Sequence, residues 1–214
     1  MGCDIHLYTE KKINGFWNLW HKSHLNKAIH HTYVEDYYRY TGRNYDLFAI
    51  LANVRNGVGF AGIVTGGGFN PICQPRGLPK DVGYEVQELS EKWDDDGHSH
   101  SWLTLRELLE YDWDSQSTTK RGVVSEITYK KWDHKGYPSE YCGASYGKGI
   151  ETLSEEEYLK LNQKDTDVTY MIEVEWDVTY RQAANQFLKE FIPRLQELAE
   201  GDLDSVRIVF WFDN

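Results

Sequence analysis

The stretch Arg207-Ile-Val-Phe-Trp-Phe-Asp-Asn214 closes the chain and is strongly apolar. A short apolar run without alternation is typical of a strand whose two faces are both buried. We therefore expect residues 207–214 to form a strand in the centre of a sheet, beside the first strand of the chain.

The first strand is expected within residues 3–20, which have the pattern of a β-hairpin. Residues 3–12 alternate apolar and polar positions, and Asn14-Gly15 is a strong hairpin-turn pair. Residues 170–178 alternate cleanly and residues 122–132 less so, which predicts two further strands. The acidic residues of 170–178 fall together on one face, which we interpret as a solvated face: Glu173, Glu175 and Asp177.

Helices are predicted in four places. Residues 45–55 have helical apolar spacing, and Thr104 and Ser154 each begin a capping-box sequence that opens a short helix. The longest predicted helix covers 179–201, with Pro193 expected to kink or split it. This order of elements predicts an α+β fold, with one largely antiparallel sheet (the N-terminal hairpin plus the C-terminal strand) and packed helices, in a single globular domain spanning 1–214.

Composition excludes several classes of protein. Apolar residues make up 40% and charged residues 27% of the 214 residues, and no apolar run approaches the ~20 residues of a membrane-spanning helix. The net charge of −11 argues against general binding to a nucleic-acid backbone. Three widely separated cysteines are typical of a reduced cytoplasmic protein. We expect no membrane association and no general nucleic-acid binding.

The charge is unevenly distributed along the chain. Residues 81–114 hold eleven acidic and two basic residues, whereas residues 39–80 hold five basic residues and one acidic residue. A basic, glycine-rich stretch beside an acidic one makes a localised anion site plausible in an otherwise acidic protein.

Two Asp/His fragments suggest a metal site. Asp4 and His6 point to the same face of a strand, and His98 and His100 do the same if their segment is extended. Together these four side chains supply the ligand types of a divalent ion, the one cofactor that the sequence suggests. Calcineurin-like phosphoesterases carry similar fragments, but their remaining motifs do not occur here. The alternative is that the histidines only hydrogen-bond within their loop.

The glycine-rich loop 57–68 is the candidate anion site. Gly57-Val-Gly-Phe-Ala-Gly62 matches the dinucleotide-binding fingerprint, but it follows a helical pattern and therefore does not predict a Rossmann site. Its glycines allow several backbone N–H groups to point at one anion, with Arg55 and Arg76 on either side. Alternatively the loop binds nothing, and Arg76 pairs with the acidic segment that follows it.

Several motifs along the chain resemble those of one family. They are Met1-Gly-Cys-Asp-Ile-His6, Arg43-Asn-Tyr-Asp-Leu-Phe48, Val54-Arg-Asn56, Pro75-Arg-Gly-Leu-Pro79, Asp96-Gly-His-Ser-His-Ser-Trp102 and Val209-Phe-Trp-Phe-Asp213. The chain resembles a family of uncharacterised proteins of tailed bacteriophages and prophages that begin Met-Gly-Cys-Asp-Ile-His. The resemblance implies a virus-encoded protein in the cytoplasm of an infected bacterial host, and it implies no activity.

Three functions remain open. The leading hypothesis is a binding protein that sequesters a small anionic ligand, namely a nucleotide-derived host defence signal of the cyclic-nucleotide or ADP-ribose type. Arg55, Arg76 and loop N–H groups would hold phosphates, Trp102 would stack on the base, and His98 or His100 would contact polar edges. The full predicted ligand-binding set is Arg43, Asn44, Arg55, Asn56, Arg76, His98, His100 and Trp102.

The first alternative is a metal-dependent hydrolase of a phosphodiester or nucleotide that uses Asp4, His6, His98 and His100. The second is an acidic inhibitor that blocks a host enzyme through residues 81–114. A homo-oligomer is left open in each case. Both leading hypotheses require that the arginine-flanked loop and the paired histidines meet at one cavity.

Overall fold

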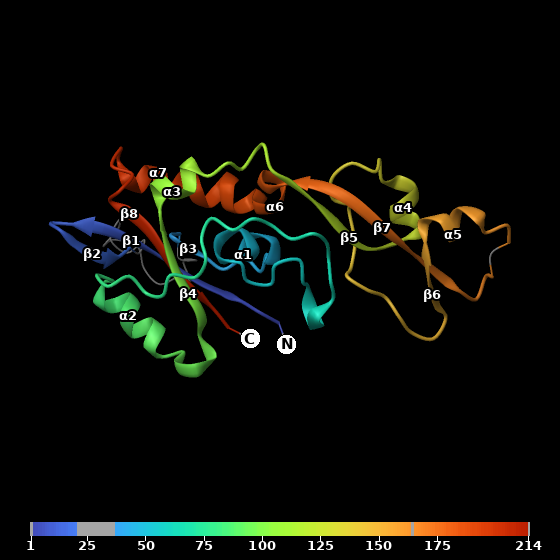
Figure 1. The fold of residues 1–214 in the computed structure, drawn as a ribbon, viewed down its shortest axis with the longest axis horizontal. Helices are drawn as coiled ribbons and strands as arrows, with labels where there is room; N and C mark the ends of the chain where they lie inside the picture. Colours follow the sequence, from blue (N-terminus) through green and yellow to red (C-terminus); the bar gives the residue numbers. More distant parts are fainter. Residues whose placement is uncertain (1, 21–36, 164, 214) are drawn as a thin grey trace, which may run out of the picture.

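The computed structural model describes residues 2–20, 37–163 and 165–213 as two sheets with helices packed on them (Figure 1). The α+β class is confirmed, and the structure adds a second, smaller sheet that the sequence analysis did not foresee. The elements in chain order are β1 (Ile5–Ile13), β2 (Phe16–Leu19), β3 (Arg39–Tyr40), α1 (Tyr45–Ala52), η2 (Phe60–Gly62), α2 (Tyr84–Glu91), η3 (Asp94–Asp96), β4 (His98–Thr104), α3 (Leu105–Glu110), β5 (Ser117–Ser125), α4 (Glu126–Lys131), β6 (Ile150–Ser154), α5 (Glu155–Lys160), β7 (Thr169–Thr179), α6 (Tyr180–Gln186), η4 (Phe187–Phe191), α7 (Ile192–Ala199) and β8 (Val206–Phe212).

The large sheet has the strand order β2-β1-β8-β4, with β3 also paired to β1. Strand β8 is antiparallel to both β1 and β4, and all seven of its residues are buried, which confirms the central position expected for the C-terminal strand. Phe210 and Phe212 belong to the main core, whereas Val209 and Trp211 face a second cluster beneath α2. Both faces of β8 are therefore covered by other elements.

The N-terminal hairpin forms as expected. Asn14 and Gly15 both have positive φ angles, of 50° and 87°, which is the backbone of a tight hairpin turn. The hairpin places β1 between β2 and β8 and brings the two chain ends together, since the Asp213 amide donates a 3.2 Å hydrogen bond to the Asp4 carbonyl. The N and C labels in Figure 1 lie side by side accordingly.

The small sheet has the strand order β5-β7-β6, in which β7 is antiparallel to β5 and parallel to β6. The predicted strand 170–178 is part of β7, and its alternation is confirmed. Its apolar residues Ile172, Val174 and Trp176 belong to the same main core as the large sheet, while the acidic face is exposed. Figure 1 shows β5 and β7 extending away from the large sheet, with β6, α4 and α5 at their far end.

The prediction of a strand over residues 122–132 is wrong in its second half. Strand β5 ends at Ser125, and helix α4 follows. The Ser125 hydroxyl accepts a 3.1 Å hydrogen bond from the Thr128 amide, so this serine caps the helix and stops the strand.

The predicted helix starts and the proline break are confirmed. Thr104 and Ser154 form complete capping boxes at the starts of α3 and α5. The long C-terminal helix is divided into α6, a π-helical turn (η4) and α7, and Pro193 occupies the first turn of α7. Among the described residues, no helix is both long and apolar enough to cross a membrane.

Candidate functional site

The predicted metal ligands Asp4 and His6 are each occupied by another partner. Arg43 donates from two nitrogen atoms to the two carboxylate oxygens of Asp4, with Nε at 2.6 Å from Oδ1. His6 Nε2 lies 3.1 Å from Asp213 Oδ2, and the His6 ring packs at a tilt against Trp93 with 3.9 Å between ring centroids. Asp4 and His6 therefore fix the two chain ends rather than form the predicted pair of ligands.

His98 and His100 lie on opposite sides of β8. Ser99 between them has φ 53°, and the register of β4 against β8 shifts here. The His98 ring faces Phe212 at 6.1 Å and the His100 ring faces Trp211 at 5.5 Å. Because Phe212 and Trp211 are neighbours in a strand, their side chains point to opposite faces.

The predicted four-residue metal site is consequently not assembled. His98–His100 is the start of β4, but the positive φ of Ser99 and the register shift against β8 interrupt the alternation there and turn the two rings to opposite faces. His100 Nε2 lies 2.9 Å from the Ser90 hydroxyl, and burial lowers its pKa, with a smaller contribution from His98. Across residues 2–20, 37–163 and 165–213, no cluster of three or more His, Cys, Asp or Glu side chains has a geometry that could hold a metal ion.

The predicted phosphate-binding arginine Arg76 is also paired internally. Its Nη1 and Nη2 atoms donate to the Glu107 carboxylate at 3.1 and 2.7 Å, and its guanidinium lies 5.1 Å from the Trp102 ring centroid. This pairing agrees with the alternative interpretation of the sequence, in which Arg76 pairs with the acidic segment that follows it. Arg55 lies over the Tyr45 ring at 5.7 Å, away from Arg76 and close to the chain ends.

The two predicted ligand-binding asparagines have structural roles. The Asn44 side chain accepts from the Leu47 amide at 3.1 Å and caps α1. The Asn56 side chain accepts from the Phe69 amide at 2.6 Å and donates to the Phe69 carbonyl at 2.7 Å. Both amide groups hold backbone in place.

The glycine-rich loop 57–68 forms a small hairpin and does not form an anion cradle. Its amides at Gly59 and Thr65 donate to loop carbonyls at 2.7 and 2.8 Å, and the Gly67 amide donates to the Thr119 carbonyl of β5 at 2.9 Å. Because these N–H groups are used internally, they do not converge on a ligand. The loop packs on the small sheet, whereas the Gly77 amide next to Arg76 donates to the His100 carbonyl on the large sheet at 2.8 Å. The expected shared cavity of loop and histidines is therefore not formed.

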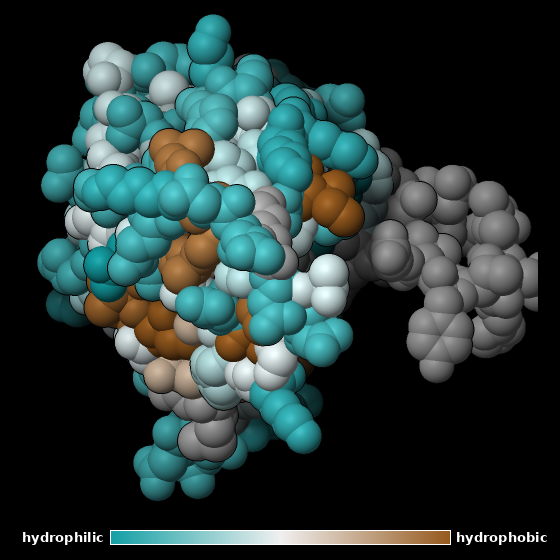
Figure 2. Space-filling view, turned by 90° about the vertical axis from the view of Figure 1, so that its right-hand side faces the viewer, coloured by the Kyte–Doolittle hydropathy of each residue, from teal (hydrophilic) through white to brown (hydrophobic). Residues whose placement is uncertain are grey.

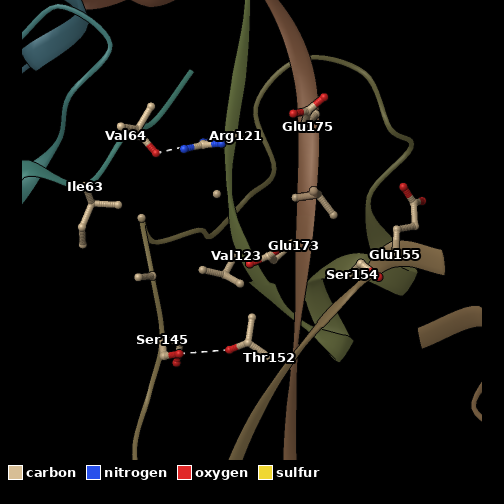
Figure 3. A pocket seen from close by; sticks show the side chains of 14 residues that line it. Ile63, Val64, Arg121, Val123, Ser145, Thr152, Ser154, Glu155, Glu173 and Glu175 are labelled. Atoms are coloured by element: carbon tan, nitrogen blue, oxygen red, sulfur yellow. Dashed lines mark hydrogen bonds between the residues drawn. The ribbon is translucent and has the colours of Figure 1, made fainter. Parts of the chain in front are cut away.

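A pocket of about 630 Å³ lies instead on the acidic face of the small sheet (Figure 3). Strand β7 contributes Glu173 and Glu175, and β5 contributes Arg121 and Val123. The remaining wall comes from β6, the start of α5 and two loops: Ile63, Val64, Gly143, Ala144, Ser145, Thr152, Ser154 and Glu155. The volume is within the range of small-molecule sites.

The sheet register explains why these side chains meet. Arg121 is directly opposite Glu175, and Val123 is opposite Glu173, which is in turn opposite Ser154 of β6. Residues paired in this way project from the same face of a sheet. The exposed face of the small sheet is therefore the floor of the pocket, and the glycine-rich loop and residues 143–145 form its sides.

The pocket carries more negative than positive charge. Arg121 Nε donates to the Val64 carbonyl at 3.1 Å, so the one guanidinium of the lining is held by the loop wall. Glu155 accepts from the Tyr129 hydroxyl at 2.6 Å. Within the described part of the chain, Glu173 and Glu175 have neither an ion pair nor a hydrogen bond.

The sequence analysis missed this pocket although it identified two of its components. The acidic face of 170–178 was interpreted as solvated, and the glycine-rich loop was assigned to a different ligand. No local pattern indicates that the loop folds against β5, because that contact joins segments more than 50 residues apart.

The acidic segment 81–114 is divided into two parts. Glu107 and Asp114 pair with Arg76 and Arg181. The carboxylates of α2 and η3 are exposed instead: Glu85, Glu88, Glu91, Asp94, Asp95 and Asp96. These six carboxylates are the part of the segment that forms an exposed acidic surface over neighbouring elements.

Comparisons with protein-family models, with curated proteins and with solved structures found no match for this chain.

Proposed function

We propose that this protein is a binding protein that holds a positively charged ligand in the pocket of the small sheet. The observation that carries the proposal is the lining itself: Glu155, Glu173 and Glu175 face the space, and its one guanidinium donates to a backbone carbonyl. An amine or guanidinium gains charge-assisted hydrogen bonds in such a pocket, whereas a phosphate is repelled.

The spacing of the carboxylates suits a single cationic group. Glu173 and Glu175 are two residues apart on one face of β7, so their backbone positions are separated by about 7 Å. Two flexible glutamate side chains at this spacing can both reach a cation placed between them. Ser145, Thr152 and Ser154 add hydroxyl groups at the edge of the pocket for the polar remainder of the ligand.

This proposal keeps stoichiometric binding from the leading hypothesis and reverses the charge of the ligand. The anionic defence signal and the phage origin stay predictions of the sequence. Arg43 and Arg76, which were expected to bind phosphate, are neutralised by Asp4 and Glu107 in the structure.

Isothermal titration calorimetry with arginine amide, spermidine, ADP-ribose and a cyclic dinucleotide tests the proposal. We expect the two cations to bind, with an affinity that falls as salt is added, because exposed charges are screened. Tighter binding of either anion would contradict the proposal and restore the original hypothesis.

Two variants locate the binding site. Glu173→Gln combined with Glu175→Gln is expected to weaken cation binding by about tenfold or more. Asp177→Asn is the matched control, since Asp177 lies on the same face of β7 but outside the pocket lining. Arg76→Ala should leave cation binding unchanged, although the anion hypothesis predicts that it abolishes ligand binding.

A further inference from the structure

A second hollow of about 430 Å³ lies next to the acidic pocket. The two spaces share four lining residues, Ile63, Gly143, Ala144 and Ser145. These shared residues make the two hollows neighbours, and we call the two together the groove. We name the two ends the acidic half and the aromatic half.

The aromatic half has a different chemistry. Phe60 and Tyr146 line it and are 63% and 85% exposed. Two exposed aromatic side chains that line one hollow form an apolar surface that a partner can cover. Figure 2 faces the end of the molecule that carries the small sheet and shows apolar side chains between polar ones on that face.

Part of the backbone along the groove is available for hydrogen bonding, although the Ser145 carbonyl accepts from the Thr152 hydroxyl at 3.0 Å. Cys142 pairs with Val123 of β5, but within the described residues the amides of 143–146 donate to no other backbone carbonyl. Exposed, unpaired backbone beside side-chain pockets is the arrangement that proteins use to recognise an extended peptide.

We propose that the groove binds an extended peptide segment of a partner protein, with a Lys or Arg side chain in the acidic half and an aromatic side chain against Phe60 and Tyr146. The proposal rests on the proposed function for its acidic half and adds the aromatic half and the class of partner. Charge complementarity favours this occupant over a second copy of the chain, because the protein carries a net charge of −11. The same charge disfavours nucleic acid.

Fluorescence anisotropy with a labelled hexapeptide, Ac-Ser-Arg-Ser-Phe-Ser-Gly-NH2, tests the proposal. Further peptides move the phenylalanine to successive positions after the arginine, so that the spacing of the two halves need not be known in advance. At the best spacing, replacing the peptide arginine with alanine should weaken binding about tenfold, and replacing its phenylalanine about fivefold.

Protein variants assign each peptide residue to its half of the groove. Phe60→Ser combined with Tyr146→Ser should bind the phenylalanine peptide no better than the alanine peptide. Phe16→Ser is the matched control, since Phe16 is 76% exposed but lies at the tip of the N-terminal hairpin. All three side chains are exposed, and so these variants are expected to fold.

Cys142 gives an independent readout, because it lines the aromatic half and is exposed while Cys3 is buried and Cys73 is half-buried. Saturating peptide should slow alkylation of Cys142 by iodoacetamide, measured by mass spectrometry of that residue. An unchanged rate at saturation would place the peptide elsewhere and overturn the proposal.

The outcomes separate the two proposals. If arginine amide binds but no spacing of phenylalanine improves affinity, the peptide inference fails and the cation pocket stands. If neither ligand binds, the proposed function fails together with the inference. Self-association that is lost in the Phe60→Ser, Tyr146→Ser variant would show that a second copy occupies the groove, and it would overturn the peptide proposal.

Discussion

The large sheet and the outer face of the small sheet differ in how their charged residues are paired. Around the large sheet, Arg43, Arg76, Arg207 and His6 are each paired with a carboxylate. On the outer face of the small sheet, Glu173 and Glu175 point into a pocket without such a partner in the described part of the chain. The side chains that suggest a binding or catalytic site in the sequence therefore stabilise the fold. The pocket is formed by residues that look like an ordinary solvated face.

The largest effect is expected from breaking the buried ion pair of the large sheet. Arg207 and Glu10 have side chains only 3% and 0% exposed, and Arg207 Nε donates to Glu10 at 2.7 Å. Burial raises the pKa of Glu10, and the neighbouring guanidinium partly reverses this rise. Arg207→Met leaves the carboxylate buried and unpaired, and we expect a loss of about 3–5 kcal/mol in the free energy of unfolding, measured with urea.

A matched variant tests whether burial or charge alone causes this loss of stability. Arg106→Met breaks an exposed pair with Asp204 and should lower the free energy of unfolding much less than Arg207→Met does, because solvent screens an exposed pair. Similar losses in both variants would show that burial of the ion pair is not the cause of the larger loss.

The second largest loss of stability is expected from breaking a buried ion pair that connects β5 to α1. Lys120 of β5 is 4% exposed and donates to Asp46 of α1 at 2.6 Å, while the Tyr137 hydroxyl donates to the same carboxylate at 2.7 Å. Lys120→Met should lower the free energy of unfolding by about 3 kcal/mol, because Asp46 loses its cation. Lys130→Met, which removes an exposed lysine paired with Glu126, is the control and should change it by about 0.5 kcal/mol or less.

A third, smaller effect tests whether the asparagines predicted to bind a ligand are structural. Asn44→Ala and Asn56→Ala should each lower the free energy of unfolding by about 1–2 kcal/mol, since a helix cap and a buried backbone contact are lost. Neither variant should change the affinity for arginine amide. A loss of affinity at unchanged stability would return these residues to the binding site.

The smallest effect is a pH dependence at Arg76–Glu107. Burial raises the pKa of Glu107, but hydrogen bonds from Arg76 and Thr104 outweigh it and hold that pKa below the ordinary value of about 4.5. A lowered folded-state pKa contributes stability above the unfolded value, and this stability is lost as the pH falls through the folded value. Glu107→Gln keeps the capping box, so we expect a slightly less stable protein at pH 7 with a shallower loss on acidification. Parallel pH profiles of the two proteins in urea titrations would contradict this role.

Sequence patterns predicted those local features that depend on neighbouring residues, but they did not predict α2, α4 or β6. The Asn14-Gly15 turn, the Thr104 and Ser154 caps and the break near Pro193 all depend on residues within a few positions of one another. The burial of β8 was also predictable, because only a strand covered on both faces tolerates a continuous apolar run.

Chemical function was not predictable in the same way. Asp4 and Arg76 are side chains that a metal or phosphate site requires, yet they pair with Arg43 and Glu107 from distant segments. A sequence shows which side chains are present but not which of them satisfy one another.

By itself, then, the sequence determined the class of fold, the hairpin, the helix caps and the central strand, because backbone preference and hydrophobic alternation act over short distances. Only the tertiary structure decided that the sheets are two, that the glycine-rich loop folds onto β5, and that Glu173 and Glu175 face a groove. Those outcomes depend on which distant segments pair and pack together. Each segment packs where the other segments leave a surface uncovered.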